Sequence, residues 1–330
     1  MQIGVLGSGS WATALAKILT DNKHPIHWWV RQESVLEQLK KRRHNPQYLP
    51  SVRFDLSLLQ LTTDAKEVVR NADLIVLATP SAYLQTSLEG LTAEDWKGKK
   101  VLSAIKGLIP QENILVNHYL QNKFGVPLDD YFTLLGPCHA EEVAEEKLSY
   151  LTFSGIDAAA TLNIANYFAT DYINTITNQD ILGVQYAAVL KNIYALGAGI
   201  AHGLEYGDNF QSVLMSNAIR EMKRFIKKMH KMKRNINNSA YLGDLLVTGY
   251  SVFSRNRMFG NMIGKGYTVK SAQMEMSMIA EGYYATKSAH LLNEKIKNKT
   301  KLPIIDAVYD ILYEGKDPKK TFKKLTEMLD

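Results

Sequence analysis

Residues 2–22 read QIGVLGSGSWATALAKILTDN, and they carry the strongest local signal of the fold class. A short apolar run at 2–6 leads into GSGSWA at 7–12, after which apolar residues recur at helical spacing. The order strand, glycine-rich turn, helix gives the G-x-G-x-x-A pattern its structural context. The stretch therefore predicts a strand that turns sharply into a helix.

Each small residue of this turn has a physical reason. Gly7 lets the chain leave the strand sharply, Gly9 leaves room for a pyrophosphate against the backbone, and Ala12 allows close helix–strand packing. The amides at the helix start, at Ser10 and Trp11, then face the phosphates with the help of the helix dipole. The pattern predicts a dinucleotide site; the alternative is a tight turn that binds nothing.

Beyond this stretch, apolar runs alternate with helical stretches through the first half of the chain. Strands are expected at residues 2–6, 26–30, 73–79, 100–105, 131–135, 149–154 and 172–177. Helices between them include residues 11–22, 33–42 and 111–122. Runs such as LIVLAT, without polar alternation, suit a sheet buried on both faces. The alternation predicts parallel strands with right-handed crossovers.

No strand pattern remains after about residue 181. Helices are expected at residues 186–201, 209–232, 271–279, 283–293, 304–313 and 319–328. The predicted fold is α/β, with a doubly wound, Rossmann-like domain at 1–182 that binds NAD(P). An all-helical substrate and catalytic domain follows at 183–330.

The composition is that of a globular, reduced protein. Hydrophobic residues make up 46% and charged residues 22% of the 330 residues, which excludes long disordered stretches. The net charge of +6 suits anionic small ligands, but it would equally serve nucleic acid or a membrane surface, so it does not choose among them. A single cysteine, Cys138, fits a reducing compartment. No signal peptide pattern precedes the first strand, so a cytoplasmic protein is expected.

Two stretches invite other interpretations. The apolar segment 186–201 carries Lys191 and Asn192 and is shorter than the roughly 20 residues of a spanning helix, so no membrane segment is expected. The basic run at 223–234 is interleaved with methionines and other apolar residues at helical spacing. We expect a solvated helix face with core-facing methionines there, rather than a nucleic-acid site.

The tip of the second strand bears on the choice of cofactor. The stretch HWWVRQ carries no acidic residue where an NAD-only site would hold the ribose 2′-hydroxyl. Arg31 would instead hold the 2′-phosphate of NADP, unless it is a solvated loop residue. Because Glu33 is close by, NAD remains compatible. The expected cofactor is NADP, with NAD tolerated.

Polar residues in unexpected places mark candidate chemistry. Lys106 follows a strand at the edge where ligands bind in open α/β sheets. Lys191 interrupts an apolar helix, where it must be partnered, neutral or functional. Asp244 and Arg255 add an acid and a base in the helical half. Cys138 and His139 do not predict a metal or thiol site, since no further cysteine and no H-E-x-x-H pattern is present.

Taken in order, these segments resemble the NAD(P)-dependent glycerol-3-phosphate dehydrogenases, specifically the bacterial-type enzyme of phospholipid synthesis. The resemblance covers nearly the whole chain and rests on GSGSWATALA, NPQYLP, SAIKGL, GPCHAEEVA, GVQYAAVLKNIYALGAG, GDN, GDLLVT, SRNRMFG, AEGYYATK and PIIDAVYDILYEGKDP. It implies interconversion of sn-glycerol 3-phosphate and dihydroxyacetone phosphate, a phosphate-bearing substrate and a cytoplasmic homodimer without a metal.

The resemblance also implies catalytic roles. Lys191, of the family's K-N motif, would be the general acid/base that protonates the forming C2 alkoxide and takes that proton in oxidation. Lys106, of the K-G-L turn, would contact substrate and cofactor and help polarise the carbonyl. Asp244 would orient Lys191 and Asn192 or the substrate hydroxyls, and Asn192 itself would contact substrate.

Binding roles follow in the same way. Arg255 and Asn256, of the family's R-N pair, would bind the substrate phosphate with Ser254 beside them, and Arg255 would also reach the cofactor. Gly136 and Cys138 fall where the family's G-P-x turn touches substrate. The positions that would line the nicotinamide side are Ala140, Ile279 and Glu281.

The sequence departs from the family at Cys138, His139 and 216–218, and it lacks the usual basic ending. These departures bear on substrate and subunit contacts. The nearest rival is a β-hydroxyacid-type dehydrogenase with a carboxylate substrate, which Arg255-Asn256 disfavours. The second alternative function is that of a dinucleotide sensor without turnover. The joint presence of Lys106, Lys191 and Asp244 disfavours it.

Overall fold

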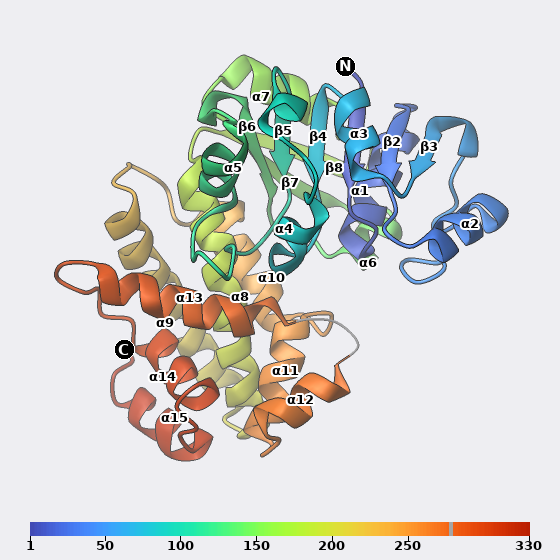
Figure 1. The fold of residues 1–330 in the computed structure, drawn as a ribbon. Coiled ribbons are helices and arrows are strands. Elements are labelled where there is room, and N and C mark those ends of the chain that lie inside the picture. The colour runs from blue at the N-terminus through green and yellow to red at the C-terminus, as the bar shows by residue number, and fades with distance from the viewer. Residues whose placement is uncertain (277–279) are drawn as a thin grey trace. The chain divides into compact units, whose positions relative to one another are not determined.

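The computed structural model describes residues 1–276 and 280–330, which form two compact units (Figure 1). Unit 1 comprises Met1–Ile105 and Ile114–Ile181. Unit 2 comprises Lys106–Asn113 and Leu182–Asp330. The main division lies next to the boundary expected after residue 182. The short segment that carries Lys106 directly follows the β5 region, yet it groups with the helical unit, which the sequence did not indicate.

Unit 1 is built on an eight-stranded sheet of order β3-β2-β1-β4-β5-β6-β7-β8. Its strands are β1 (Ile3–Leu6), β2 (Ile26–Trp29), β3 (Leu59–Thr62), β4 (Leu74–Leu77), β5 (Lys100–Ser103), β6 (Tyr131–Leu135), β7 (Ser149–Ser154) and β8 (Ile173–Asn178). The expected doubly wound α/β class is confirmed.

Two details of the sheet were wrong in the sequence prediction. Strand β3 was missed because its LQLT sequence contains polar residues and is only partly buried, so it lacks the apolar run of the central strands. Strands β6 and β7 pair antiparallel, not parallel. The connection between them contains only the five-residue helix α6 (Ala140–Ala144), which is too short for the usual helical crossover.

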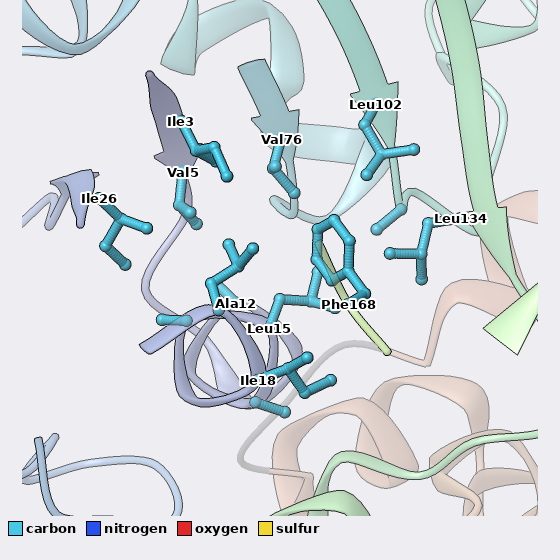
Figure 2. Close-up of a cluster of buried hydrophobic side chains, with 14 of the residues drawn as sticks. Ile3, Val5, Ala12, Leu15, Ile18, Ile26, Val76, Leu102, Leu134 and Phe168 are labelled. Carbon is cyan, nitrogen blue, oxygen red and sulfur yellow. The ribbon is translucent and has the colours of Figure 1, made fainter. Parts of the chain in front are cut away.

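Helices cover both faces of this sheet. They are α1 (Ser10–Asp21), α2 (Glu33–Arg42), α3 (Ala65–Asn71), α4 (Leu84–Ser87), α5 (Val116–Phe124), α6 and α7 (Ala158–Asn166). Figure 2 shows Leu15 and Ile18 of α1 among buried side chains of the sheet, such as Val76. On the opposite face α3 packs closely over β1, where a Cβ on Gly4 would come within 2.7 Å of the Val68 side chain.

Unit 2 is helical, as expected. Its helices are α8 (Ile181–Gly203, whose first residue belongs to unit 1), α9 (Gly207–Met229), α10 (Asp244–Tyr250), α11 (Arg255–Gly264), α12 (Val269–Glu275), α13 (Glu281–Lys295), α14 (Pro303–Leu312) and α15 (Pro318–Thr326). Within the described residues no strand follows β8. The end of the helix expected at 271–279 lies outside the described residues.

Helix α8 is long and apolar enough to cross a membrane by length and composition alone, and it is the only such helix among the described residues. Nearly all of it is buried inside the protein. This burial is that of a core helix, and α11, α13 and α14 pack against it.

Helices α8 and α11 approach each other backbone to backbone. A Cβ on Gly199 would lie 2.1 Å from the carbonyl oxygen of Arg257, and one on Gly260 would lie 2.0 Å from that of Leu196. Two more glycines one turn along, Gly203 and Gly264, continue the contact. Because only glycine fits at this crossing, it fixes α11, from Arg257 to Gly264, against the C-terminal part of α8, from Leu196 to Gly203.

The basic run on α9 forms an exposed helix face, with Lys223 and Lys227 exposed and Met222 and Phe225 buried. The expectation of core-facing methionines is wrong for Met232, which is 39% exposed. The reason is that α9 ends three residues earlier, so the helical periodicity no longer applies there.

Candidate active site

The glycine turn after β1 has the geometry that a phosphate group requires. Gly7 has φ +133°, and a Cβ there would lie 2.7 Å from the carbonyl oxygen of Ala78, so no other residue fits. A Cβ on Gly9 would meet nothing within 4 Å, which leaves open space beside the backbone. These residues fit a dinucleotide pyrophosphate.

Helix α1 begins directly after this turn. Its N-cap residue is Gly9, which has no side chain to cap the helix, and the first turn of α1 contains no acidic residue. Ser10 is buried and Trp11 half-buried at this helix start. The first turn of α1 therefore places none of its own carboxylates at the positive end of the helix dipole, where a phosphate would bind.

Arg31 lies two residues beyond β2 and is exposed. Glu33, the acidic residue close to it in sequence, begins α2. The guanidinium of Arg31 is thus accessible near the end of the strand that follows the glycine turn.

In unit 2, three charged side chains come together from separate segments. Lys191, midway along α8, is 4% exposed and forms an ion pair with Oδ1 of Asp244, the first residue of α10. The Nζ of Lys106 lies 3.9 Å from Oδ2 of the same carboxylate. The Thr248 hydroxyl donates a hydrogen bond of 2.7 Å to the main-chain oxygen of Asp244. One buried carboxylate thus joins two lysines.

The protonation equilibrium of Lys191 is shifted by this environment. Burial lowers the pKa of Lys191 from its ordinary 10.5 to about 8, with the carboxylate of Asp244 opposing the shift and the charge of Lys106 adding to it. A lysine with this pKa exchanges a proton near neutral pH, which is what a general acid/base requires.

A chain of amide hydrogen bonds runs beside the ion pair. Asn192 donates from Nδ2 to the main-chain oxygen of Lys106 at 2.9 Å. Asn256 of α11 donates to Oδ1 of Asn192 at 3.0 Å and accepts at 2.8 Å from the main-chain nitrogen of Gly282 in α13. Asp244 contacts Lys191 as expected, whereas the described partners of Asn192 are Lys106 and Asn256. Glu281 precedes Gly282 at the start of α13.

The start of α11 carries the candidate phosphate ligands. Ser254 is the N-cap, and its hydroxyl accepts a hydrogen bond of 3.3 Å from the main-chain nitrogen of Arg257. Arg255 is half-buried as the first helical residue, and Asn256 is fixed by the amide chain. The helix N-terminus adds a positive dipole end to the guanidinium of Arg255.

The turn after β6 belongs to unit 1. Gly136 has φ +134°, and a Cβ there would lie 2.9 Å from the carbonyl oxygen of Tyr150. The thiol of Cys138 donates to that same oxygen at 3.2 Å. Ala140 begins α6 and is buried. Ile279, the remaining expected site residue, lies outside the described residues.

Unit 2 therefore brings Lys106, Lys191 and Asp244 together, with Asn192 and Asn256 beside them. Sequence reasoning missed Thr248, although its spacing of four residues from Asp244 places it on the same side of a helix. It also missed Asn45, which is fully buried and bonds to the glycine turn. Its asparagine-proline pair looks like an ordinary turn.

A sheet unit whose glycine turn suits a dinucleotide, together with a helical unit that buries a lysine of lowered pKa beside a carboxylate, defines an NAD(P)-dependent dehydrogenase. The sequence matches two protein-family models. Residues 2–161 match the model described as "NAD-dependent glycerol-3-phosphate dehydrogenase N-terminus", and residues 180–323 match the one described as "NAD-dependent glycerol-3-phosphate dehydrogenase C-terminus". The chain belongs to the NAD-dependent glycerol-3-phosphate dehydrogenase family. The resemblance seen in the sequence is confirmed.

Individual relatives agree with this assignment. Glycerol-3-phosphate dehydrogenase [NAD(P)+] of Bacillus subtilis is 35% identical over 317 residues, which covers 95% of this chain and 90% of that protein. The solved glycerol-3-phosphate dehydrogenase of Coxiella burnetii has a TM-score of 0.90 at 26% identity and covers 99% of this chain and 98% of its own. A D-mandelate dehydrogenase solved with NADH, at 12% identity and TM-score 0.61 over 97% of this chain and 100% of its own, shares the fold alone.

Proposed function

We propose that this protein interconverts sn-glycerol 3-phosphate and dihydroxyacetone phosphate by hydride transfer with NADP or NAD. The observation that carries the proposal is Lys191, buried against Asp244 with its pKa lowered to about 8, in a member of this family. The test is oxidation of NADPH by the purified protein with dihydroxyacetone phosphate. Turnover with a 2-oxo acid instead of dihydroxyacetone phosphate would favour the alternative function, a β-hydroxyacid-type dehydrogenase with a carboxylate substrate.

The nicotinamide, when bound, supplies the hydride that reduces C2 of the substrate. Protonated Lys191 donates a proton to the C2 oxygen as negative charge develops there, and in the reverse direction neutral Lys191 accepts it. Asp244 keeps the ammonium in place while Lys191 is charged. The proton thus moves within a buried site, away from solvent.

The remaining polar groups of unit 2 orient the substrate. Oδ2 of Asp244 has no hydrogen-bond partner among the residues that the structure describes, so it is a candidate acceptor for a substrate hydroxyl. Lys106, whose Nζ lies 3.9 Å from Oδ2 of Asp244, polarises the C2 carbonyl of the substrate. Asn192 contacts the substrate. Asn256 and Arg255 bind the substrate phosphate.

We assign the other expected positions to the roles that the sequence pattern and the family resemblance imply. The glycine turn with Ser10 and Trp11 holds the pyrophosphate, and Arg31 holds the 2′-phosphate of NADP. Ser254 assists the phosphate ligands, and Gly136 and Cys138 border the substrate. The nicotinamide side is assigned to Ala140, Ile279, Glu281 and Arg255.

Replacing Arg255 with alanine should raise the KM for dihydroxyacetone phosphate by at least about 10-fold, because a charge-assisted phosphate contact is lost. The KM for NADPH should change less, and the thermal midpoint should stay within a few degrees. Lys265→Ala removes the same charge at the other end of α11 and should leave both KM values unchanged. If the two variants behave alike, the phosphate binds elsewhere.

Replacing Arg31 with aspartate should weaken NADPH binding far more than NADH binding, by about 10-fold in the ratio of the two Kd values. The guanidinium is lost and a carboxylate then faces the 2′-phosphate, whereas NADH carries a hydroxyl there. Lys41→Asp reverses an exposed charge on α2 and serves as control. Equal weakening of both cofactors by Arg31→Asp would show that Arg31 does not read the 2′-phosphate.

We further propose that unit 1 is the cofactor domain and unit 2 the substrate domain of a cytoplasmic homodimer. The buried rather than lipid-facing α8 and the single cysteine support the cytoplasmic assignment. Exposed apolar side chains around the α10–α11 connection, such as Val252 at 71% and Phe253 at 47%, support a subunit contact there. We also propose that the glycerol 3-phosphate made by this protein supplies phospholipid synthesis.

A further inference from the structure

Three consecutive carbonyl groups of the glycine turn are each held by a side chain from a different element of unit 1. The indole of Trp28 in β2 donates to the carbonyl oxygen of Gly7 at 2.7 Å. The Asn45 amide donates to that of Ser8 at 3.0 Å, and the Thr13 hydroxyl of α1 donates to that of Gly9 at 2.9 Å. The turn is therefore held residue by residue.

Peptide planarity converts these bonds into a direction for the amide groups. In a trans peptide the C=O and the following N–H point in opposite directions. Holding the carbonyls of Gly7, Ser8 and Gly9 therefore turns the N–H groups of the next residues away from the three donors. Backbone N–H groups are the donors that a phosphate accepts from in such a turn.

Asn45 connects this arrangement. Its Nδ2 donates both to the Ser8 carbonyl and, at 2.9 Å, to the Thr13 hydroxyl that in turn donates to Gly9. Its Oδ1 accepts from the main-chain nitrogens of Gln47 at 3.0 Å and Tyr48 at 3.2 Å, which fixes the amide orientation. With no exposed surface, Asn45 acts from behind the turn.

We propose that Asn45 is a positioning residue for the dinucleotide: its amide holds the Ser8 carbonyl and the Thr13 hydroxyl so that the turn presents its N–H groups to the pyrophosphate before the cofactor arrives. The proposal rests on the cofactor site of the proposed function. Pre-set donors spare the ligand the cost of ordering the turn, so their loss reduces affinity for the cofactor rather than turnover.

The test is the Kd for NADPH of Asn45→Asp, measured by nicotinamide fluorescence without turnover. Aspartate keeps the acceptor for Gln47 and Tyr48 but cannot donate to Ser8 or Thr13. The Kd should rise about 10-fold or more, and the KM for NADPH should rise with it. At saturating NADPH, kcat and the KM for dihydroxyacetone phosphate should remain near wild-type values.

Asn22→Asp is the matched control. The Asn22 amide also donates to two main-chain oxygens, those of Tyr167 at 3.0 Å and Ala169 at 2.8 Å, but at the other end of α1. Asn22→Asp changes the charge by the same amount as Asn45→Asp, but at the end of α1 away from the glycine turn. Asn22→Asp should therefore lower the thermal midpoint, because its two hydrogen bonds are lost, without raising the Kd for NADPH. Two neutral variants exclude the added charge as the cause: Trp28→Phe and Thr13→Val each remove one holding bond and should each raise the Kd about 3-fold or more.

The outcomes separate this proposal from the proposed function. A wild-type protein that binds NADPH but does not reduce dihydroxyacetone phosphate contradicts the proposed function, and the Kd values still decide the role of Asn45. A Kd within about 2-fold of wild type in Asn45→Asp, or in both neutral variants if Asn45→Asp does not fold, overturns the positioning role. A wild type that binds neither NADPH nor NADH overturns both.

Discussion

Replacing Lys191 with methionine should lower kcat for dihydroxyacetone phosphate reduction by about 10²–10⁴ or more, while the Kd for NADPH stays nearly unchanged. Hydride addition leaves negative charge on the C2 oxygen, and the site must exclude water, so the proton has to come from the protein. Lys191 combines burial, a carboxylate partner and a pKa of about 8, which suits that transfer.

Two further variants keep this prediction decisive. Methionine leaves the buried Asp244 without its closer cation, which destabilises the fold by about 3–5 kcal/mol in comparable cases. Lys191→Arg keeps the ion pair but cannot give up its proton near neutral pH, so it should fold and still lose activity. If Lys191→Met kept near-normal kcat while Lys106→Met abolished it, the two lysines would exchange roles.

Replacing Gly260 with alanine should destabilise unit 2 by about 3 kcal/mol or more in chemical denaturation. The added Cβ would lie 2.0 Å from the carbonyl oxygen of Leu196 and 2.9 Å from the nitrogen of Ile200, both in the α8 backbone. Backbone atoms inside a helix cannot yield, so the two helices must separate. Because α11 carries Asn256 and α8 carries Asn192, the KM for dihydroxyacetone phosphate should rise as well.

Gly197→Ala is the control for this prediction. It introduces the same methyl group in α8, but the new atom would meet only side-chain carbons, of Val308 at 3.3 Å and Ile304 at 3.6 Å. Its stability should stay within about 1 kcal/mol of wild type, since alanine also favours the helix. Equal stability of the two variants would show that the α8–α11 crossing is not held by close backbone contact.

The sequence predicted the fold class because the decisive signals are local. The glycine turn lies between a strand and a helix at 2–22, and the apolar periodicity changes from short runs to helical spacing near residue 181. Strand β3 was not predicted because a half-buried strand lacks the continuous apolar run of a buried one. The antiparallel pairing of β6 and β7 depends on how the chain returns to the sheet, which no local pattern records.

The site was predictable only in part. The residues alone marked Lys191, in an apolar helix, and Lys106, after a strand, as candidates, and the family resemblance supplied their roles. Lys106 is linked to other residues of the helical unit by a hydrogen bond from Asn192 and by the carboxylate of Asp244, 138 residues further along. The role of Asn45 depends on a contact across 37 residues. Such contacts are set by packing, not by spacing.

The decisive measurement is the pH dependence of kcat/KM in both directions, in wild type and Lys191→Met, because kcat/KM reports the pKa of groups in the free enzyme. Reduction requires protonated Lys191, so its kcat/KM should fall as the pH rises through about 8. Oxidation of glycerol 3-phosphate requires neutral Lys191, so its kcat/KM should rise over the same interval. The residual rates of Lys191→Met should show no inflection there. An inflection near pH 8 that persisted in Lys191→Met would contradict the account, because another group would then carry the proton.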